Sequence, residues 1–145
     1  MKSAMSRRSL TILCIDDDWN GLLKRKIVLE QNGYRVIESS DAEEGLRLFC
    51  KYVVDAVIVD YQMPVISGDV VASKMKGIRS EVPILLLSTY GPLAPKKLRS
   101  VDMFLSKSDE PKMLIPSLRR LLSKPKPFFD RWLSAWRGRN RTVLS

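Results

Sequence analysis

Short apolar runs alternate along the chain with longer segments in which apolar residues recur at helical spacing. The five runs that predict strands are residues 10–15, 34–38, 56–59, 84–87 and 103–105. The five segments that predict helices are residues 18–31, 41–51, 69–76, 95–100 and 111–122. Because the elements alternate and the strands are largely apolar, the pattern predicts a parallel α/β sheet covered by helices on both faces.

Capping residues support the ends of the first two predicted helices, whereas glycine and proline residues weaken the prediction of the last two. Ser40 or Asp41 is expected to cap the second helix, and Asn32-Gly33 to close the first. The fourth helix is weakly encoded, because glycine and proline residues crowd its start at residues 91–95. Pro116 lies inside the last helix, which predicts a distorted first turn or a later start.

Composition narrows the class of protein. The chain has 145 residues, of which 45% are hydrophobic and 28% charged, and this suits one globular domain with a tail. It has no histidine, which excludes a histidine triad and a His-ligated zinc site, and its two cysteines are too few for a disulfide scaffold. Without a long apolar run or a signal-peptide core, we expect a cytoplasmic protein.

The positive charge is concentrated at the carboxyl end. The net charge is +9, and residues 124–145 hold six Lys/Arg and one Asp, so they carry more than half of it. We therefore divide the chain into a basic segment at 1–8, a domain at 9–123 and a basic aromatic tail at 124–145. Such a tail is either a solvated extension or a surface attracted to an acidic partner.

Four polar sites follow the predicted strands and should meet at the carboxyl edge of the sheet. They are Asp16–Asp18, Asp60, Ser88-Thr89 and Lys107. Singly, each is more often a capping, turn or solvated residue, but four coincidences at one edge are a poor explanation. Clustered carboxylates suit Mg²⁺, a carboxylate can attack phosphorus, and a lysine and a hydroxyl can bind phosphoryl oxygens.

These residues resemble the receiver domain of two-component response regulators. The resemblance spans about residues 9–123 and rests on CIDDDW at 14–19, VIVDYQMPVISG at 57–68, PILLLST at 83–89 and FLSK at 104–107. It implies a flavodoxin-like, doubly wound fold, with a five-stranded parallel sheet of order 2-1-3-4-5 flanked by five helices.

The resemblance also implies a role for each matching residue. Asp60 matches the phosphoryl-accepting aspartate, and Lys107 the lysine that pairs with the phosphoryl group. Asp17 matches a direct Mg²⁺ ligand and Asp16 a ligand acting through water, while Gln62 would contribute its backbone carbonyl. Ser88 and Phe104 match the hydroxyl and aromatic residues of the conformational switch. The seven residues are Asp16, Asp17, Asp60, Gln62, Ser88, Phe104 and Lys107.

The implied reaction is Mg²⁺-dependent phosphoryl transfer to Asp60 from the phosphohistidine of a sensor histidine kinase or a phosphotransfer protein. Slow self-dephosphorylation would reset the domain, so it is not a conventional enzyme. The output would be a changed surface presented to a downstream protein that the sequence does not identify. Ser108 stands where the family carries a cis proline, and a cis bond without proline costs about 2.5–4 kcal/mol, which favours a trans bond here.

The tail is too short for a further domain, so we expect a single-domain response regulator. Its aromatic and basic residues recur at helical spacing: Phe128, Phe129, Arg131, Trp132, Trp136 and Arg137. They could pack on the receiver or on a second copy, dock on a protein partner, or bind an anionic surface. No base-reading motif is present, so sequence-specific DNA binding is not expected.

Two other functions compete with a phosphorylated switch. One is a receiver-fold binding module that acts without phosphorylation, which Thr89, Ser108 and the weak fourth helix favour. The other is a small phosphatase with Asp60 as its nucleophile, and the chain shows no substrate-pocket motif for it. Multiple turnover of small phosphate esters would identify the phosphatase.

Overall fold

A computed structural model describes residues 9–123. The proposed segments 1–8 and 124–145, with all the tail residues named above, lie outside the described residues. In the described part, no helix combines the length and the apolar character needed to cross a membrane.

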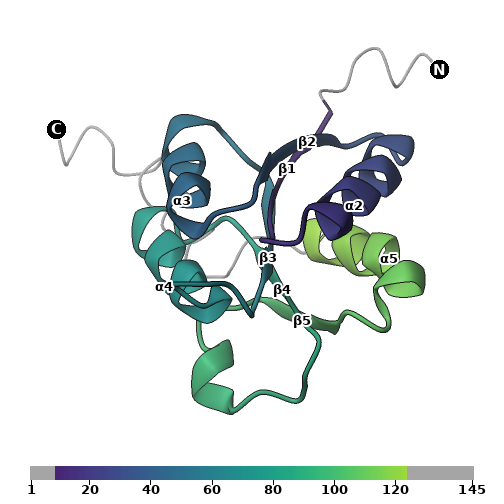
Figure 1. Cartoon of the computed structure of the whole chain (residues 1–145). Coiled ribbons are helices and arrows are strands. Elements are labelled where there is room, and N and C mark those ends of the chain that lie inside the picture. The colour runs from purple at the N-terminus through teal and green to yellow at the C-terminus, as the bar shows by residue number, and fades with distance from the viewer. Residues whose placement is uncertain (1–8, 124–145) are drawn as a thin grey trace, which may run out of the picture.

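Five strands form a single parallel sheet (Figure 1). They are β1 (Thr11–Ile15), β2 (Arg35–Ser39), β3 (Ala56–Asp60), β4 (Ile84–Ser88) and β5 (Met103–Ser106). Their order is β2-β1-β3-β4-β5, as predicted. The register pairs Ile15 with Val59 and Asp60 with Leu87, so the ends of the central strands lie together.

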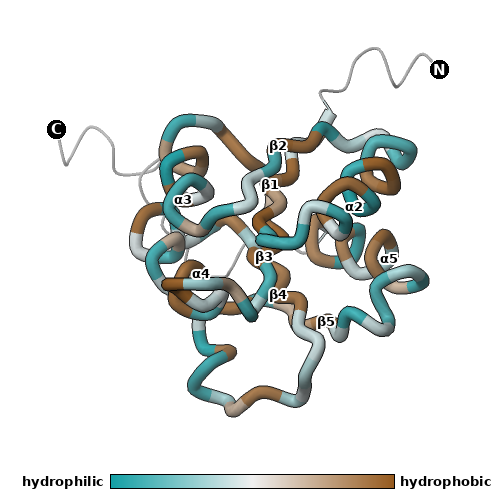
Figure 2. The backbone as a smooth tube through the Cα atoms, in the orientation of Figure 1, coloured by the Kyte–Doolittle hydropathy of each residue, from teal (hydrophilic) through white to brown (hydrophobic). Residues whose placement is uncertain are grey.

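The helices cover both faces of the sheet. They are α2 (Trp19–Gln31), α3 (Ala42–Lys51), α4 (Gly68–Ile78) and α5 (Glu110–Ser123). Figure 1 shows α2 and α5 on one face and α3 and α4 on the other. Successive strand residues point to opposite faces, so Leu13 packs with the α3 and α4 core and Ile12 with the α2 and α5 core. Figure 2 shows the hydrophobic strands between these two layers.

Capping residues act where the sequence predicts them. Asp41 accepts a hydrogen bond from the Glu43 N–H and caps α3, and Asp18 caps α2 through the Asn20 N–H. Gly33 has a φ of 90°, a left-handed conformation that lets the chain turn from α2 toward β2. Pro116 lies within α5, which starts at Glu110, so of the two alternatives given for this helix the later start was wrong.

The prediction of five helices was wrong at the fourth. Residues Pro95–Leu98 form a single 3₁₀ turn, η1, so the described part contains four α-helices. The segment contributes no buried residue, and Gly91, Pro92 and Pro95 limit its local helical preference. Leu98 is only partly buried against the α3 and α4 core, and this packing offsets little of that weak preference.

The loop between β3 and α4 contains a strained residue. Val65 has a φ of 72° and is 95% exposed. A branched side chain is disfavoured in the left-handed region, and burial does not offset this cost here.

Val65→Asn should therefore stabilise the fold by about 1 kcal/mol, because asparagine tolerates the left-handed region better. Urea denaturation of the two proteins measures the difference. Val65→Ile keeps the branched side chain and should give no gain. Equal stability of all three proteins would contradict the strain assigned to this residue.

Candidate functional site

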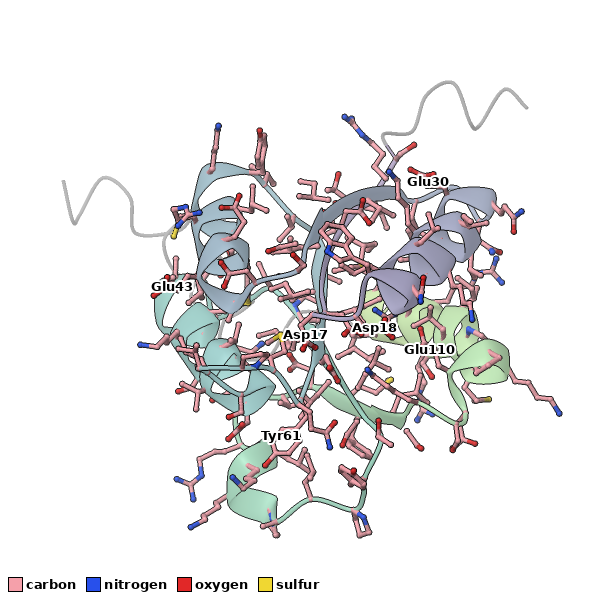
Figure 3. The ribbon with its side chains drawn as sticks, viewed as in Figure 1. Asp17, Asp18, Glu30, Glu43, Tyr61 and Glu110 are labelled. Carbon is pink, nitrogen blue, oxygen red and sulfur yellow. The ribbon has the colours of Figure 1, made fainter. Side chains whose placement is uncertain are left out.

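Three aspartates gather at the carboxyl edge of the sheet. Asp16 directly follows β1 and its N–H donates to the Ser39 carbonyl, while Asp60 is the last residue of β3. Both are buried, and Asp17 beside them is exposed. One carboxylate oxygen from each of the three lies within 4.8 Å of the other two. We call Asp16, Asp17 and Asp60 the acidic cluster; Figure 3 shows Asp17 in the loop after β1.

Gly68 fixes how the chain leaves the cluster. Its N–H donates to the Tyr61 carbonyl at 2.9 Å, which draws the start of α4 over the end of β3. A Cβ at position 68 would lie 2.3 Å from the Asp60 carbonyl oxygen, so this close approach requires glycine. The spacing from Asp60 to Gly68 in the sequence motif is therefore a packing requirement of the site.

Lys107 brings a positive charge to the acidic cluster. Its N–H donates to the Ser88 carbonyl at 2.8 Å, and its Nζ lies 3.2 Å from Asp16 Oδ2 and 3.1 Å from Asp60 Oδ1. Within residues 9–123 the cis peptide bond is Gly91-Pro92, so Lys107-Ser108 is trans, as expected. Burial opposes the ammonium charge, but the two aspartates raise the pKa of Lys107, so it stays protonated at neutral pH.

Asp60 is held in an unfavourable electrostatic environment. Burial and, to a lesser extent, repulsion by Asp16 raise its pKa to about 6, against the opposing effect of Lys107. Its Oδ1 is buried and has no hydrogen-bond partner among the described residues, although the Lys107 ammonium is close. The carboxylate is thus ionised at neutral pH but incompletely compensated.

The acidic cluster fits a divalent cation. It offers three carboxylate ligands from two adjacent strand ends, and one of its buried oxygens lacks a hydrogen bond. Oxygen ligands of this kind suit a hard cation. Asp16, Asp17 and Asp60 are the residues that would hold it.

Ser88 and Gln62 lie at the same edge of the sheet, whereas Phe104 lies within β5 opposite Leu86. Ser88 ends β4 and is fully buried, but its hydroxyl is engaged by the backbone of Tyr90, whose N–H donates to it at 3.0 Å. Gln62 accepts a hydrogen bond from the Thr89 N–H at 3.4 Å, which links the loops after β3 and β4. Phe104 is half-buried against the backbone of Gly91, where an added Cβ would lie 2.9 Å from its ring.

Sequence reasoning missed a second cation beside the cluster, and this one is buried. Arg25 of α2 is 3% exposed, lies 3.3 Å from Asp16 Oδ2 and forms a two-pronged ion pair with Glu110. Figure 3 shows Glu110 at the start of α5. The helical spacing could have indicated that Arg25 is buried. It falls three residues after Leu22 and four before Leu29, and both leucines are buried.

Comparison with known proteins gives a consistent family match. The sequence model described as "response regulator receiver domain" matches residues 12–119. The chain is 29% identical to the transcriptional regulatory protein GlrR of Escherichia coli (strain K12), covering 97% of this chain and 32% of GlrR. It spans between a third and about half of the length of the first curated relatives that it matches.

Solved structures match the described fold closely. The response regulator protein TrrA of Thermotoga maritima, in complex with Mg²⁺-BeF, has a TM-score of 0.74 and 29% identity, covering 77% of this chain and 98% of TrrA. A chain of the complex between histidine kinase ThkA and TrrA has a TM-score of 0.73 and 30% identity, covering 79% of this chain and 99% of that one.

Asp60→Asn should stabilise the fold at neutral pH. Because the folded pKa of about 6 exceeds the reference value of 3.8, ionising Asp60 costs stability as the pH rises from 4 through 6. Asparagine removes that cost, so the variant should gain about 3 kcal/mol above pH 7 and less than about 1 kcal/mol at pH 4. Urea denaturation across this pH range measures the gain, and Asp17→Asn, at an exposed carboxylate, should change stability much less. A gain that does not vary with pH would contradict this account.

Proposed function

The chain belongs to the response regulator receiver domain family, and from this we propose that it is a phosphoryl-accepting switch whose acceptor is Asp60. The observation that carries the proposal is the contact of Lys107 with both Asp16 and Asp60 at the acidic cluster. These groups provide a nucleophile, a cation for phosphoryl oxygens and ligands for a metal at one place.

In the proposed step, an Asp60 carboxylate oxygen attacks phosphorus. The P–N bond of a partner's phosphohistidine breaks as the new P–O bond forms, and the bonding electrons leave with the imidazole nitrogen. The Asp60 pKa of about 6 leaves the carboxylate ionised at neutral pH and poorly compensated, which favours attack. Lys107 is close enough to Asp60 to bind an oxygen of the transferred group.

Mg²⁺ is the cation that we propose for the acidic cluster. The site would hold it through Asp16, Asp17 and Asp60, with the backbone carbonyl of Gln62 as a further ligand. When bound, it offsets the repulsion among the carboxylates and the charge of the phosphoryl group. The TrrA structure, described as a complex with Mg²⁺-BeF, supports this choice of metal.

Ser88 and Phe104 are the proposed switch. The Ser88 hydroxyl would exchange its hydrogen bonds with Tyr90 for one to the phosphoryl group, because it is buried at the end of the strand next to β3. That exchange would change the loop that contains Gly91, against which Phe104 packs. Phe104 has no hydroxyl, so its alternative positions would differ only in packing.

A sensor histidine kinase or a phosphotransfer protein is the proposed donor. The structure of TrrA with histidine kinase ThkA supports a partner of this class. The 145 residues contain no histidine, which is consistent with a partner as the source of the phosphohistidine. The downstream partner is a protein that would distinguish the two states of the switch.

Residues 124–145 are proposed as a separate interaction segment. Their aromatic and basic residues suit a protein groove or an anionic surface.

If binding is electrostatic, retention of the full chain on anionic vesicles should fall steeply between about 50 and 300 mM salt, because added salt screens exposed charges over this range. Retention that is absent at low salt would favour a protein partner.

Phosphorylation can be tested by intact mass. With Mg²⁺ and phosphoramidate, the wild-type chain should gain one phosphoryl group, while Asp60→Asn should gain none. Asp17→Asn should need more Mg²⁺ for the same gain, because it loses a ligand. Equal incorporation into Asp60→Asn would refute the assignment of the acceptor, and absence of any gain from phosphoramidate or from a histidine kinase would favour the binding module that acts without phosphorylation.

Lys107→Ala should slow phosphorylation by roughly 100-fold, because the variant removes a cation aimed at the developing charge. The initial rate at saturating Mg²⁺ measures this effect. Lys112→Ala, at an exposed lysine of α5, is the control and should leave the rate unchanged. An unaltered rate in Lys107→Ala would remove Lys107 from the proposed chemistry.

A further inference from the structure

Arg25 occupies a position where an apolar side chain would be expected. It lies on the buried face of α2 between Leu22 and Leu29, and it is the one buried arginine among residues 9–123. Burying a guanidinium costs free energy unless its charge is paired. The protein accepts this cost next to the acidic cluster, where the charge of Arg25 acts on Asp16.

Two carboxylates compensate Arg25, from opposite sides. Its Nε and Nη2 donate to the Glu110 carboxylate at 2.5 and 3.2 Å, which uses the fork geometry of the guanidinium. Its Nη1 lies 3.3 Å from Asp16 Oδ2, and this nitrogen has no aligned hydrogen bond among the described residues. Glu110 therefore anchors the side chain, and the remaining donor faces the cluster.

Asp16 Oδ2 lies between two cations. Lys107 Nζ is 3.2 Å from the same oxygen that Arg25 approaches, and Asp16 Oδ1 accepts a hydrogen bond from the Asp18 N–H. Both oxygens of this buried carboxylate are thus occupied by the protein itself. An incoming metal must share Asp16 with these groups.

We propose that Arg25 is a resident cation of the acidic cluster, anchored by Glu110, and that it sets how tightly the cluster binds a divalent cation. This inference rests on the proposed Mg²⁺ site. Arg25 is a positioning residue here, because it acts through Asp16 and not on the reacting atoms.

Arg25 and Glu110 carry opposite charges, so they should have opposite effects on the affinity of the acidic cluster for a divalent cation. Arg25 stabilises Asp16 without a metal and repels a divalent cation, so it lowers the affinity of the cluster. Glu110 offsets that repulsion with its own negative charge, so it raises the affinity. A guanidinium stays protonated at neutral pH, so its effect is permanent.

A purely mechanical role predicts a different result. If Arg25 and Glu110 only fasten α2 to α5, then removing either one loosens the same contact. Both single variants would then change Mg²⁺ affinity in the same direction. The sign of the two changes therefore separates the hypotheses.

The test is a Mg²⁺ titration of the full chain at neutral pH, followed by tryptophan fluorescence, since Trp19 starts the helix after the acidic loop. Arg25→Met should bind Mg²⁺ about 3- to 10-fold more tightly, and Glu110→Gln about 3- to 10-fold more weakly. The double variant should return to within about 3-fold of the wild type, because the opposing charges are removed together.

An ion pair that joins α2 to β2 serves as the control. Lys26 and Glu38 lie 3.8 Å apart and are partly exposed, so Lys26→Met and Glu38→Gln should each change the Mg²⁺ dissociation constant less than about 2-fold. Circular dichroism checks that each variant is folded. If Arg25→Met does not fold, Glu110→Gln still tests the proposal, because unchanged or tighter binding in it would overturn the role of Arg25.

The outcomes distinguish this inference from the proposed function. If Arg25→Met and Glu110→Gln change the Mg²⁺ affinity in the same direction, the Arg25–Glu110 pair only holds α2 and α5 together, and the proposal is overturned. A wild-type response to Mg²⁺ that Asp17→Asn weakens would leave the proposed function intact in that case. If the wild type and Asp17→Asn both fail to respond to Mg²⁺ by fluorescence and by calorimetry, the metal site and the role of Arg25 are both overturned.

Discussion

The repulsion among three carboxylates at one edge of the sheet is the constraint on which the site depends. Asp16 and Asp60 are buried at the ends of neighbouring strands, where water cannot screen them, and Asp17 lies beside them. The structure offsets this repulsion with Lys107, which directly follows β5, and with Arg25 from α2. Charge balance therefore depends on elements that are distant in the sequence, and it requires that their relative positions be fixed.

The fold meets this demand with rigid elements and a few close contacts. The parallel strands hold their carboxyl ends in register, so residues that follow them meet without long loops. Gly68 lets α4 approach the carbonyl of Asp60, and Glu110 holds Arg25 at the opposite side of the cluster. The raised pKa of Asp60 reflects an incomplete balance, which is a stability cost at the proposed phosphoryl acceptor.

The accuracy of the sequence predictions follows from how local each signal is. The strands and the caps at Asp18 and Asp41 were predictable, because apolar runs and side chains that bond to nearby backbone act within a few residues. The prediction of a fourth helix at residues 95–100 was wrong, since the turn at Pro95–Leu98 has no buried residue and only Leu98 packs partly against the core. Arg25 was missed because its position on the buried face of α2 reads as a core position, and the partner that makes burial tolerable is 85 residues away.

The sequence by itself determined the order of the elements, the two apolar layers, and the carboxylates, hydroxyl and lysine that follow the strands. Those features depend on local periodicity and on one topological rule, that parallel strands end at a common edge. Only the tertiary structure decided which of these groups touch, how deeply each is buried, and that two cations converge on Asp16. Burial and distance decide electrostatic energies, and neither quantity exists until the chain has folded.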